Sequence, residues 1–313
     1  MWLKTPSRPY QSSKSVREAY DSWTSDGILE FYWGEHIHLG YYESTSWFNS
    51  CDNIFLSIFR AFNSPDASSA AFVEAKSRFI SKMAQFGGIC DTRNHTEIVD
   101  IGCGIGGTTR ALAAMIDSAF VTGISISERQ VERARELSIA QSVNNVRFIV
   151  EDAIDMGKLP SSAYDIVWIC ESSEHIADKK ALLAEACRVL KPGGRLVMAA
   201  WCSRDPRNSQ EEKTRQFLEQ EWSHPSFASI QRLSFLLTDL GMNEVAAADW
   251  TEETIPSWYH SIIVGVWNPW PVIVRPDLWL KTIREIYTIS LMHVAFRDGL
   301  MQYGMFRATK PRN

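Results

Sequence analysis

The sequence predicts an α/β protein whose core is a doubly wound, mostly parallel sheet of seven strands. Three observations predict this fold. Short apolar segments between residues 97 and 201 alternate with segments of helical periodicity, which is typical of βαβ units. A glycine-rich loop follows the first of these segments, and two further strand-like segments lie near the C-terminus. Because such sheets bind ligands at the carboxyl ends of their strands, we expect the functional site there.

Each strand and helix expected in the central region is predicted by a local pattern in the sequence. The first five expected strands cover 97–101, 120–124, 146–150, 165–170 and 195–201. The fourth is nearly continuous in apolar residues, as buried parallel strands are. Ser127 followed by Gln130 predicts a capping box for a helix that runs to about Ser142. Apolar residues from Leu182 to Leu190 share one helical face, and the Lys-Pro-Gly-Gly sequence at 191–194 ends that helix.

The remaining segments surround this core. Residues 1–90 are mostly helical and aromatic in character, and we expect an N-terminal helical cap and substrate segment there. Residues 91–203 contain the expected ligand-binding core. Residues 204–313 complete the core with strands at 244–250 and 302–308 and add helical cap insertions. We expect these additions to cover the open edge of the sheet, where a substrate pocket would lie.

Composition excludes several classes of partner. The net charge is −5 and no run of Lys and Arg forms a basic stripe, so nucleic acid is not expected as a partner. The longest apolar stretch, 286–296, is too short to cross a bilayer, although it is compatible with lying on one. The six cysteines form no CxxC pair and mostly lie in apolar segments. This indicates buried free thiols in a reducing compartment, at Cys51, Cys90, Cys103, Cys170, Cys187 and Cys202.

The first 17 residues carry positive charge. They contain Lys4, Arg8, Lys14 and Arg17, several serines and no acidic residue. The segment lacks the apolar region of a secretory signal. It is compatible either with a solvated basic tail or with the remnant of an organelle transit peptide.

The loop after the first strand has the spacing of a nucleotide-binding turn. Gly102, Gly104 and Gly107 allow the backbone to turn tightly and to approach a ligand closely. A nicotinamide cofactor would need an acid at the end of the second strand for its ribose hydroxyls, but that strand ends in Gly-Ile-Ser. S-Adenosylmethionine would use an acid just before the loop and another after the third strand, and Asp100 and Asp152 occupy these places.

Residues 99–107 resemble motif I of class I S-adenosylmethionine-dependent methyltransferases, and residues 190–196 resemble the motif before their fifth strand. The resemblance implies a Rossmann-like fold with S-adenosyl-L-methionine as the cofactor. The second strand departs from the common pattern, because most of these enzymes have a ribose-binding acid where this chain has serines and a glutamine. The cofactor-binding residues that the resemblance implies are Asp100, Gly102, Gly104, Gly106, Gly107, Ser125, Ile126, Gln130, Asp152, Ala153 and Glu171.

Four other segments resemble a narrower family, the hydroquinone C-methyltransferases of vitamin E and plastoquinone synthesis, within the tocopherol methyltransferase family. They cover 20–42, 171–176, 222–225 and 248–251. The resemblance implies methylation of the aromatic ring of a prenylated hydroquinone that carries a phytyl or solanesyl tail. Methylation of γ-tocopherol and N- or O-methylation of another small molecule are the alternatives within this class of enzyme. A catalytically silent binding protein is the alternative outside it.

Methylation of an aromatic carbon requires a base, because removal of the ortho phenol proton places charge on the ring. Histidine is the natural base near neutral pH. His175, directly after the fourth strand, and His36 and His38, in the N-terminal cap, are the candidates, and Glu35 or Glu174 could orient one of them. If His175 is the base, the rate should rise with pH through an apparent pKa near that of an ordinary histidine. This chemistry needs no metal, and we expect no metal site.

Five tryptophans lie in one short stretch near the C-terminus: Trp250, Trp258, Trp267, Trp270 and Trp279. They could line a pocket for a prenyl tail, lie at a membrane interface as aromatic anchors or pack between cap helices. Residues 267–271 contain two prolines and cannot form a regular helix, so exposed anchors are plausible there.

The family resemblance also sets an expectation about location. Because a prenylated substrate lives in a bilayer, we expect peripheral membrane contact, at a plastid membrane if the source is a photosynthetic eukaryote. Residues 44–70 are an insertion relative to the family, and their Phe and Ile content predicts a helix.

Overall fold

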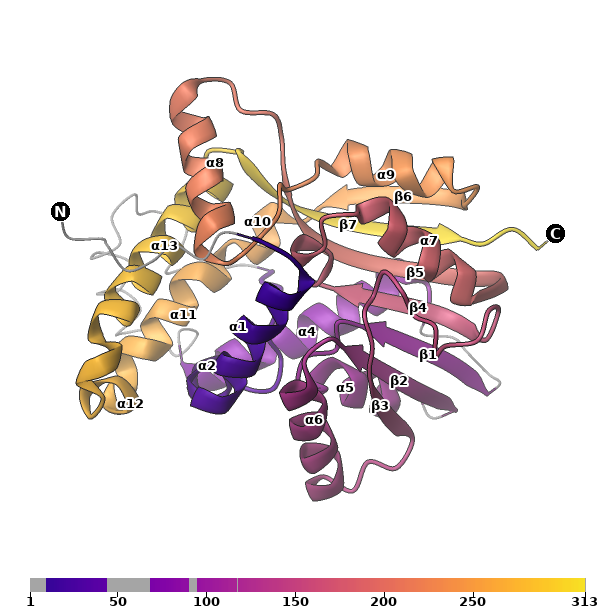
Figure 1. Cartoon of the computed structure of the whole chain (residues 1–313), viewed down its shortest axis with the longest axis horizontal. Coiled ribbons are helices and arrows are strands. Elements are labelled where there is room, and N and C mark those ends of the chain that lie inside the picture. Colours follow the sequence, from indigo (N-terminus) through magenta and orange to yellow (C-terminus); the bar gives the residue numbers. More distant parts are fainter. Residues whose placement is uncertain (1–9, 44–67, 90–94, 117, 313) are drawn as a thin grey trace.

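The computed structural model describes residues 10–43, 68–89, 95–116 and 118–312. Within these residues the chain forms one seven-stranded sheet, as the sequence predicts (Figure 1). The strands are β1 (Thr96–Ile101), β2 (Ala119–Ser125), β3 (Val146–Val150), β4 (Tyr164–Cys170), β5 (Leu190–Ser203), β6 (Asn243–Asp249) and β7 (Met301–Thr309).

The strand order is β3-β2-β1-β4-β5-β7-β6. Strands β1 to β5 pair in parallel, and β7 is antiparallel to both of its neighbours, β5 and β6. The chain reverses its direction of travel across the sheet between β1 and β4. In a doubly wound sheet this point opens a crevice at the carboxyl ends of the strands, where ligands bind. The fold class is therefore the predicted one, a Rossmann-like α/β fold.

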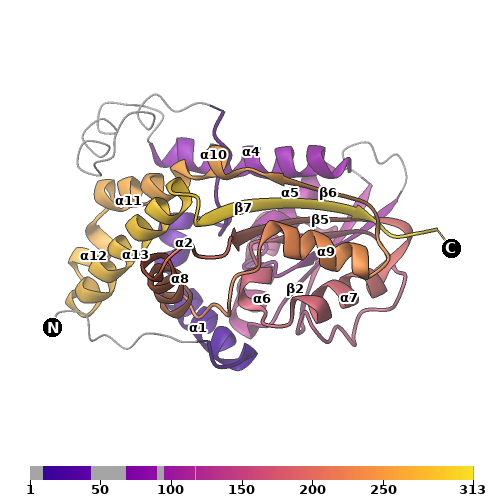
Figure 2. The same cartoon turned by 90° about the horizontal axis from the view of Figure 1, so that it is seen from above.

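Helices cover both faces of the sheet (Figure 2). Helices α4 (Ser69–Gly87) and α5 (Gly107–Met115) lie on one face, and α7 (Lys179–Val189) and α9 (Ile230–Asp239) lie on the other. Phe79 of α4 and Trp168 of β4 are fully buried in the same cluster. Burial of each such side chain contributes roughly 1.5–3 kcal/mol, so α4 is a part of the core packing. Helix α6 (Glu128–Ala140) packs on β2 and β3.

The other helices gather at one end of the sheet, away from the C-terminus (Figure 1). They are α1 (Ser13–Asp26), α2 (Ile28–Trp33), α8 (Ser209–Glu221), α10 (Thr251–Thr254), α11 (Pro256–Trp267), α12 (Trp270–Ile273) and α13 (Trp279–Arg297). Two short 3₁₀ turns, Ser173–His175 and Pro276–Leu278, connect elements around them. Among the helices that the structure describes, none is both long and apolar enough to cross a membrane.

Two local expectations need correction, and a third lies mostly outside the described residues. Helix α7 ends at Val189, one residue early, because Leu190 is already extended and pairs with Tyr164 in the sheet. Ser127 caps α6 as predicted, but Gln130 does not return the reciprocal bond of a capping box, because its side-chain oxygen accepts from Ser125 instead. Most of the insertion expected at 44–70 lies outside the described residues.

Candidate active site

The glycine loop joins the end of β1 to the start of α5. Gly104 has φ +54°, a left-handed conformation that disfavours residues with a side chain. A Cβ at this position would point into open space, and its nearest described neighbour would be Nε2 of Gln130, at 4.0 Å. The loop therefore presents bare backbone to a pocket at the carboxyl ends of β1 and β2.

This cofactor pocket has a cavity volume of about 120 Å³. It brings together most of the residues that the sequence assigns to the cofactor, including both acids, at the end of β1 and after β3. The predicted residues that line it are Asp100, Gly102, Gly104, Ser125, Ile126, Gln130, Asp152, Ala153 and Glu171. Because segments far apart in the sequence converge here as the motifs require, the pocket fits a nucleoside-type ligand with a charged amino-acid end.

Two of the predicted glycines, Gly106 and Gly107, are not among the described residues that line this pocket. A Cβ on Gly106 would lie 2.7 Å from the ring of Phe148, so this glycine provides room for packing between α5 and the sheet. A Cβ on Gly107 would collide with the backbone carbonyl of Glu35 and lie 3.0 Å from Nδ1 of His36. Gly107 thus allows the N-terminal cap to approach α5.

Asp100 is the most deeply buried carboxylate of the cofactor pocket. Its side chain is 1% exposed and accepts a hydrogen bond of 2.6 Å from the hydroxyl of Thr109. Burial raises the pKa of Asp100 to about 7. A positively charged ligand group nearby would favour the ionised carboxylate, so this residue can couple cofactor binding to loss of a proton.

The N-terminal cap covers the cofactor pocket. Tyr20 of α1 and Ile37 and His38 beyond α2 line it. Three polar contacts fasten the cap to the core: Ser127 to Asp21 at 2.6 Å, Arg110 to Glu35 at 2.6 Å, and a bidentate pair from Arg133 to Glu30 at 2.7 and 3.0 Å. The cap is therefore docked over the cofactor site by charged pairs.

A second, larger pocket, with a cavity volume of about 460 Å³, adjoins the first. Aromatic and aliphatic side chains from α1, α2, α11, α12, α13 and the C-terminal end of α8 dominate its walls, among them Trp23, Leu29, Trp33, Trp222 and Trp258. Tyr20, Ile37, Glu171 and His175 line both pockets. We call these four residues the junction, since a group held in one pocket meets a group held in the other there.

Glu171 is the ionisable carboxylate of the junction. It directly follows β4 and has φ +47°, an uncommon value for a residue with a side chain. Its Oε1 accepts hydrogen bonds from the backbone N–H of Leu39, at 2.8 Å, and from the hydroxyl of Tyr303, at 2.6 Å. Burial raises the pKa of Glu171 to about 8. A carboxylate in this range can take up a proton near neutral pH.

His175 is the imidazole of the junction. Its Nε2 lies 2.6 Å from the hydroxyl oxygen of Tyr20, and its ring stacks on that of His224 with centroids 4.2 Å apart. Burial, and then the charge of Lys179, lower the pKa of His175 to about 3. The imidazole is therefore neutral throughout the physiological pH range. A rise of the rate with pH through the pKa of an ordinary histidine is then no longer expected from His175.

The other predicted catalytic residues lie elsewhere. Glu174 follows in the same 3₁₀ turn, but its carboxylate accepts from the backbone N–H of Trp201, and Tyr20 is the hydrogen-bond partner of His175. His38 lines only the cofactor pocket, and its Nδ1 bonds the carbonyl of Leu39 at 2.8 Å. His36 is among the described lining residues of neither pocket. The structure therefore brings only one of the three candidate histidines to the junction.

Sequence reasoning did not single out Tyr20, Tyr303 or His224 as functional residues. Each is placed by tertiary contacts that no spacing in the sequence reveals. Tyr20 and His224 do lie in segments that resemble the family, at 20–42 and 222–225, and those segments were the available signal.

Comparisons with known proteins agree with this site. Residues 99–198 match the family described as a methyltransferase domain. The chain is 41% identical, over 97% of its own length and 90% of the relative's, to 2-methyl-6-phytyl-1,4-hydroquinone methyltransferase of Synechocystis sp.. It is 30% identical, over 95% of its length and 82% of the relative's, to the chloroplastic tocopherol O-methyltransferase of Arabidopsis thaliana.

A solved structure shares the fold. Geranyl diphosphate C-methyltransferase of Streptomyces coelicolor, in complex with Mg²⁺, geranyl diphosphate and S-adenosyl-L-homocysteine, superimposes with a TM-score of 0.69 at 18% identity, over 96% of this chain and 99% of that one. The cofactor is S-adenosylmethionine, and the residues of the glycine loop and the two acids fit it. The chain belongs to the S-adenosylmethionine-dependent methyltransferases, in the family of the 2-methyl-6-phytyl-1,4-hydroquinone and tocopherol methyltransferases.

Proposed function

We propose that the enzyme methylates a ring carbon of a prenylated hydroquinone such as 2-methyl-6-phytylhydroquinone or its solanesyl analogue. One observation carries the proposal: the cofactor pocket and the large apolar pocket meet at a junction that holds an ionisable carboxylate and a neutral imidazole. The names of the two relatives support the same substrate class.

The apolar pocket suits a prenyl tail. It is larger than the cofactor pocket, and hydrophobic and aromatic side chains make up most of its lining. Such walls bind a hydrocarbon through burial of apolar surface, at roughly 25 cal/mol per Å². The junction places a carboxylate, an imidazole and a phenol beside the cofactor pocket, so a substrate with a polar ring and an apolar tail would be oriented with its ring toward the cofactor.

We assign the proton transfer to Glu171. A general base works best when its pKa lies near the working pH, and burial raises the pKa of Glu171 to about 8, whereas burial lowers that of His175 to about 3. Glu171 would take the proton of the ring hydroxyl ortho to the reacting carbon. Charge then moves onto that carbon, which would form its new bond to the methyl group as the bond from the methyl group to sulfur breaks and leaves a neutral thioether. The ring proton would pass to solvent, and Glu171 would return its proton to the ring oxygen, which restores the aromatic hydroquinone. When bound, S-adenosylmethionine supplies the electrophilic methyl group.

His175 would orient the substrate. Tyr20 and His224 hold the imidazole from two sides, so its position is set before the substrate binds. If its Nε2–H donates to Tyr20, its Nδ1 keeps a free lone pair for a hydroxyl of the ring. Nδ1 is buried and has no hydrogen-bond partner among the described residues.

We further propose that the enzyme works at a membrane surface. Large apolar side chains of α12, α13 and the turn between them are exposed, including Trp270 at 69%, Val274 at 70% and Leu280 at 63%. Ile273 and Ile286 belong both to this exposed surface and to the lining of the apolar pocket. The surface is thus continuous with the pocket, and a prenyl tail could pass from a bilayer into the pocket without crossing water. In a source with plastids, we infer a plastid membrane.

Transfer of a labelled methyl group tests the proposal. The purified enzyme would receive S-adenosylmethionine labelled with ¹³C in its methyl group and a panel of hydroquinones with a phytyl tail, a solanesyl tail or no tail. We expect labelled methyl on a ring carbon of the tailed substrates, and a much lower kcat/KM without the tail. A methyl ether as the product, or equal rates on tail-less phenols, would favour the alternative of a small-molecule O- or N-methyltransferase.

A further inference from the structure

His224 has no assigned role in the reaction, although it lies beside the junction. Its side chain is 4% exposed and lines the apolar pocket. Its ring stacks on that of His175 at an interplanar angle of 26°. Because His175 belongs to the junction, His224 borders the place that the substrate ring must occupy.

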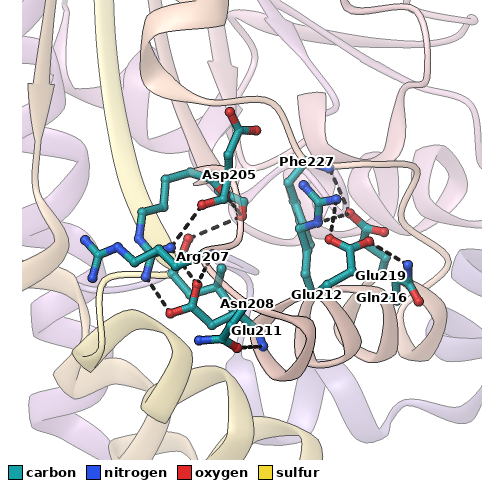
Figure 3. A network of polar contacts seen from close by, with 12 residues as sticks. Asp205, Arg207, Asn208, Glu211, Glu212, Gln216, Glu219 and Phe227 are labelled. Carbon is teal, nitrogen blue, oxygen red and sulfur yellow. Dashed lines mark hydrogen bonds and ion pairs between the residues drawn. The ribbon is translucent and has the colours of Figure 1, made fainter.

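The backbone around His224 is held firmly. Its N–H donates to the carbonyl of Glu219 in the last turn of α8, at 2.8 Å. Figure 3 shows the polar network along this helix, in which the carboxylate of Glu219 also accepts from the backbone N–H of Phe227, at 3.2 Å. At the start of α8, Asn208 caps the helix and the carboxylate of Glu211 accepts from the backbone N–H of Arg207. The network fixes the segment from both sides, so His224 is preorganised.

The hydrogen-bonding state of the imidazole follows from its contacts. Nδ1 is buried and has no hydrogen-bond partner within the described part of the chain. The backbone of Glu174 favours a proton on the ring, and because Nδ1 is unpartnered we place that proton on Nε2. Burial holds the pKa of His224 well below its usual range, so the ring is neutral. Nδ1 therefore offers a lone pair and no hydrogen.

Several other polar groups of the same pocket already have partners, whereas Nδ1 of His175 and the indole N–H groups of Trp201 and Trp258 have none among the described residues. The indole N–H of Trp222 donates to Glu285 at 3.0 Å, and the hydroxyl of Tyr32 donates to the carbonyl of Asn268 at 2.8 Å. The hydroxyl of Ser261 donates to its own helix. Because buried polar groups are normally satisfied, the free acceptor of His224 is expected to receive its partner from a ligand.

We propose that Nδ1 of His224 accepts a hydrogen bond from a ring hydroxyl of the substrate and so selects the reduced hydroquinone over the corresponding quinone. This inference rests on the proposed function. A hydroxyl can donate to Nδ1. A quinone carbonyl or a methyl ether has no O–H hydrogen to donate, so its oxygen lone pair would face the lone pair of Nδ1 and be repelled. A site built to accept from a hydroxyl rejects an analogue that lacks it, since a buried group is then left unpaired.

Equilibrium binding tests this selection without turnover. Enzyme saturated with S-adenosyl-L-homocysteine would be titrated with the phytyl hydroquinone, its two monomethyl ethers and the quinone. We expect wild-type enzyme to bind the quinone and one of the ethers about tenfold more weakly, as for one lost neutral hydrogen bond. His224→Phe keeps a ring that can stack on His175 but removes the acceptor. It should abolish the preference over that one ether, whereas part of the preference over the quinone should remain, because Glu171 still accepts from the other hydroxyl. His224→Asn keeps an acceptor near Nδ1 and should retain the preference, and Ser261→Ala, as the control, should leave the preference as in wild type.

The outcomes separate this inference from the proposed function. If wild-type enzyme methylates hydroquinones but binds hydroquinone, quinone and both ethers equally, or if His224→Phe keeps the full preference over the ether that wild type rejects, the role of His224 is contradicted. If wild-type enzyme methylates no hydroquinone, the proposed function itself fails. Should His224→Phe not fold, ¹⁵N NMR of histidine-labelled wild-type enzyme decides. The Nδ1 resonance, assigned with His224→Asn, should shift when hydroquinone binds and not when quinone binds, and equal shifts would overturn the inference.

Discussion

The hydroxyl oxygen of Tyr20 lies 2.6 Å from Nε2 of His175, a residue 155 positions further along the chain. The two rings also meet edge to face, with centroids 5.1 Å apart. Tyr20 belongs to α1 of the N-terminal cap, and His175 follows β4 of the core. Docking of the cap and positioning of the junction are therefore one event, and loss of this contact should affect the chemical step as well as folding.

Tyr20→Phe tests that relationship. Removal of the hydroxyl leaves Nε2 of His175 without its partner in a buried site, and the imidazole loses its fixed orientation. We expect kcat to fall about 10- to 100-fold, corresponding to roughly 1.4–2.7 kcal/mol, with little change in cofactor affinity. Tyr164→Phe is the matched control, because it removes a buried hydroxyl that contacts Arg147 on the sheet. An unchanged kcat in Tyr20→Phe would show that the contact has no part in catalysis.

Gly107→Ala should displace the cap. The added methyl group collides with the backbone of Glu35, which cannot move aside as the end of a flexible side chain could. The side chain of Glu35 is also held in place by Arg110. We expect a higher KM for the hydroquinone and faster proteolysis within α1 and α2, because the closed position of the cap is destabilised. Gly157→Ala, whose Cβ would find its nearest described neighbour at 3.8 Å, is the control. Equal proteolysis of wild type and Gly107→Ala would contradict the close approach.

Cofactor affinity should depend on pH through Asp100. Burial raises the pKa of this carboxyl to about 7 in the unliganded pocket, whereas the positively charged amino group of the cofactor favours the ionised form. Binding then expels a proton below about pH 7, so Kd should rise as pH falls, by up to about tenfold per pH unit. Asp100→Asn should bind weakly and lose this slope. Calorimetric titrations between pH 5.5 and 8 in buffers of different ionisation enthalpy would reveal the proton release or its absence.

Membrane binding should depend on the exposed apolar surface of α12 and α13. Trp270→Glu places a charge on a side chain that is 69% exposed, and we expect about a tenfold or greater loss of partition into vesicles that contain prenylquinone. Ile139→Glu, at a residue of α6 that is 80% exposed, introduces the same charge away from this surface and serves as the control. Activity on a detergent-solubilised short-chain substrate should be retained in both. Equal co-sedimentation of the two variants would refute the proposed surface.

Most of the fold could be predicted from the sequence because the signals are local. Continuous apolar segments mark the buried parallel strands, and the glycine loop marks the turn from β1 into α5. The same local logic located Asp100 and Asp152, which the structure brings into one pocket. The close approaches at Gly106 and Gly107 are to Phe148 and to the backbone of Glu35, and the spacing of glycines does not say whether a ligand, a ring or another backbone makes such an approach.

The junction could be predicted only in part. His175 and Glu171 follow a strand of the sheet and were expected near the ligands. The partners that define their chemistry, Tyr20 and Tyr303, come from α1 and β7, and their approach depends on tertiary packing. The pKa values diverge for the same reason. Burial raises that of the carboxyl and lowers that of the imidazole, so the assignment of the base shifts from histidine to glutamate.

The pH dependence of methyl transfer in wild type and Glu171→Gln tests the central assignment most directly. Since only the ionised carboxylate can take the proton and its pKa is raised to about 8, kcat/KM should rise with pH through that region. The glutamine keeps an acceptor for Tyr303 and Leu39, so the fold should survive. We expect the variant to lose about 10²- to 10⁴-fold in kcat and to lose the rising limb. A variant with near-normal kcat and an unchanged profile would contradict proton transfer at Glu171.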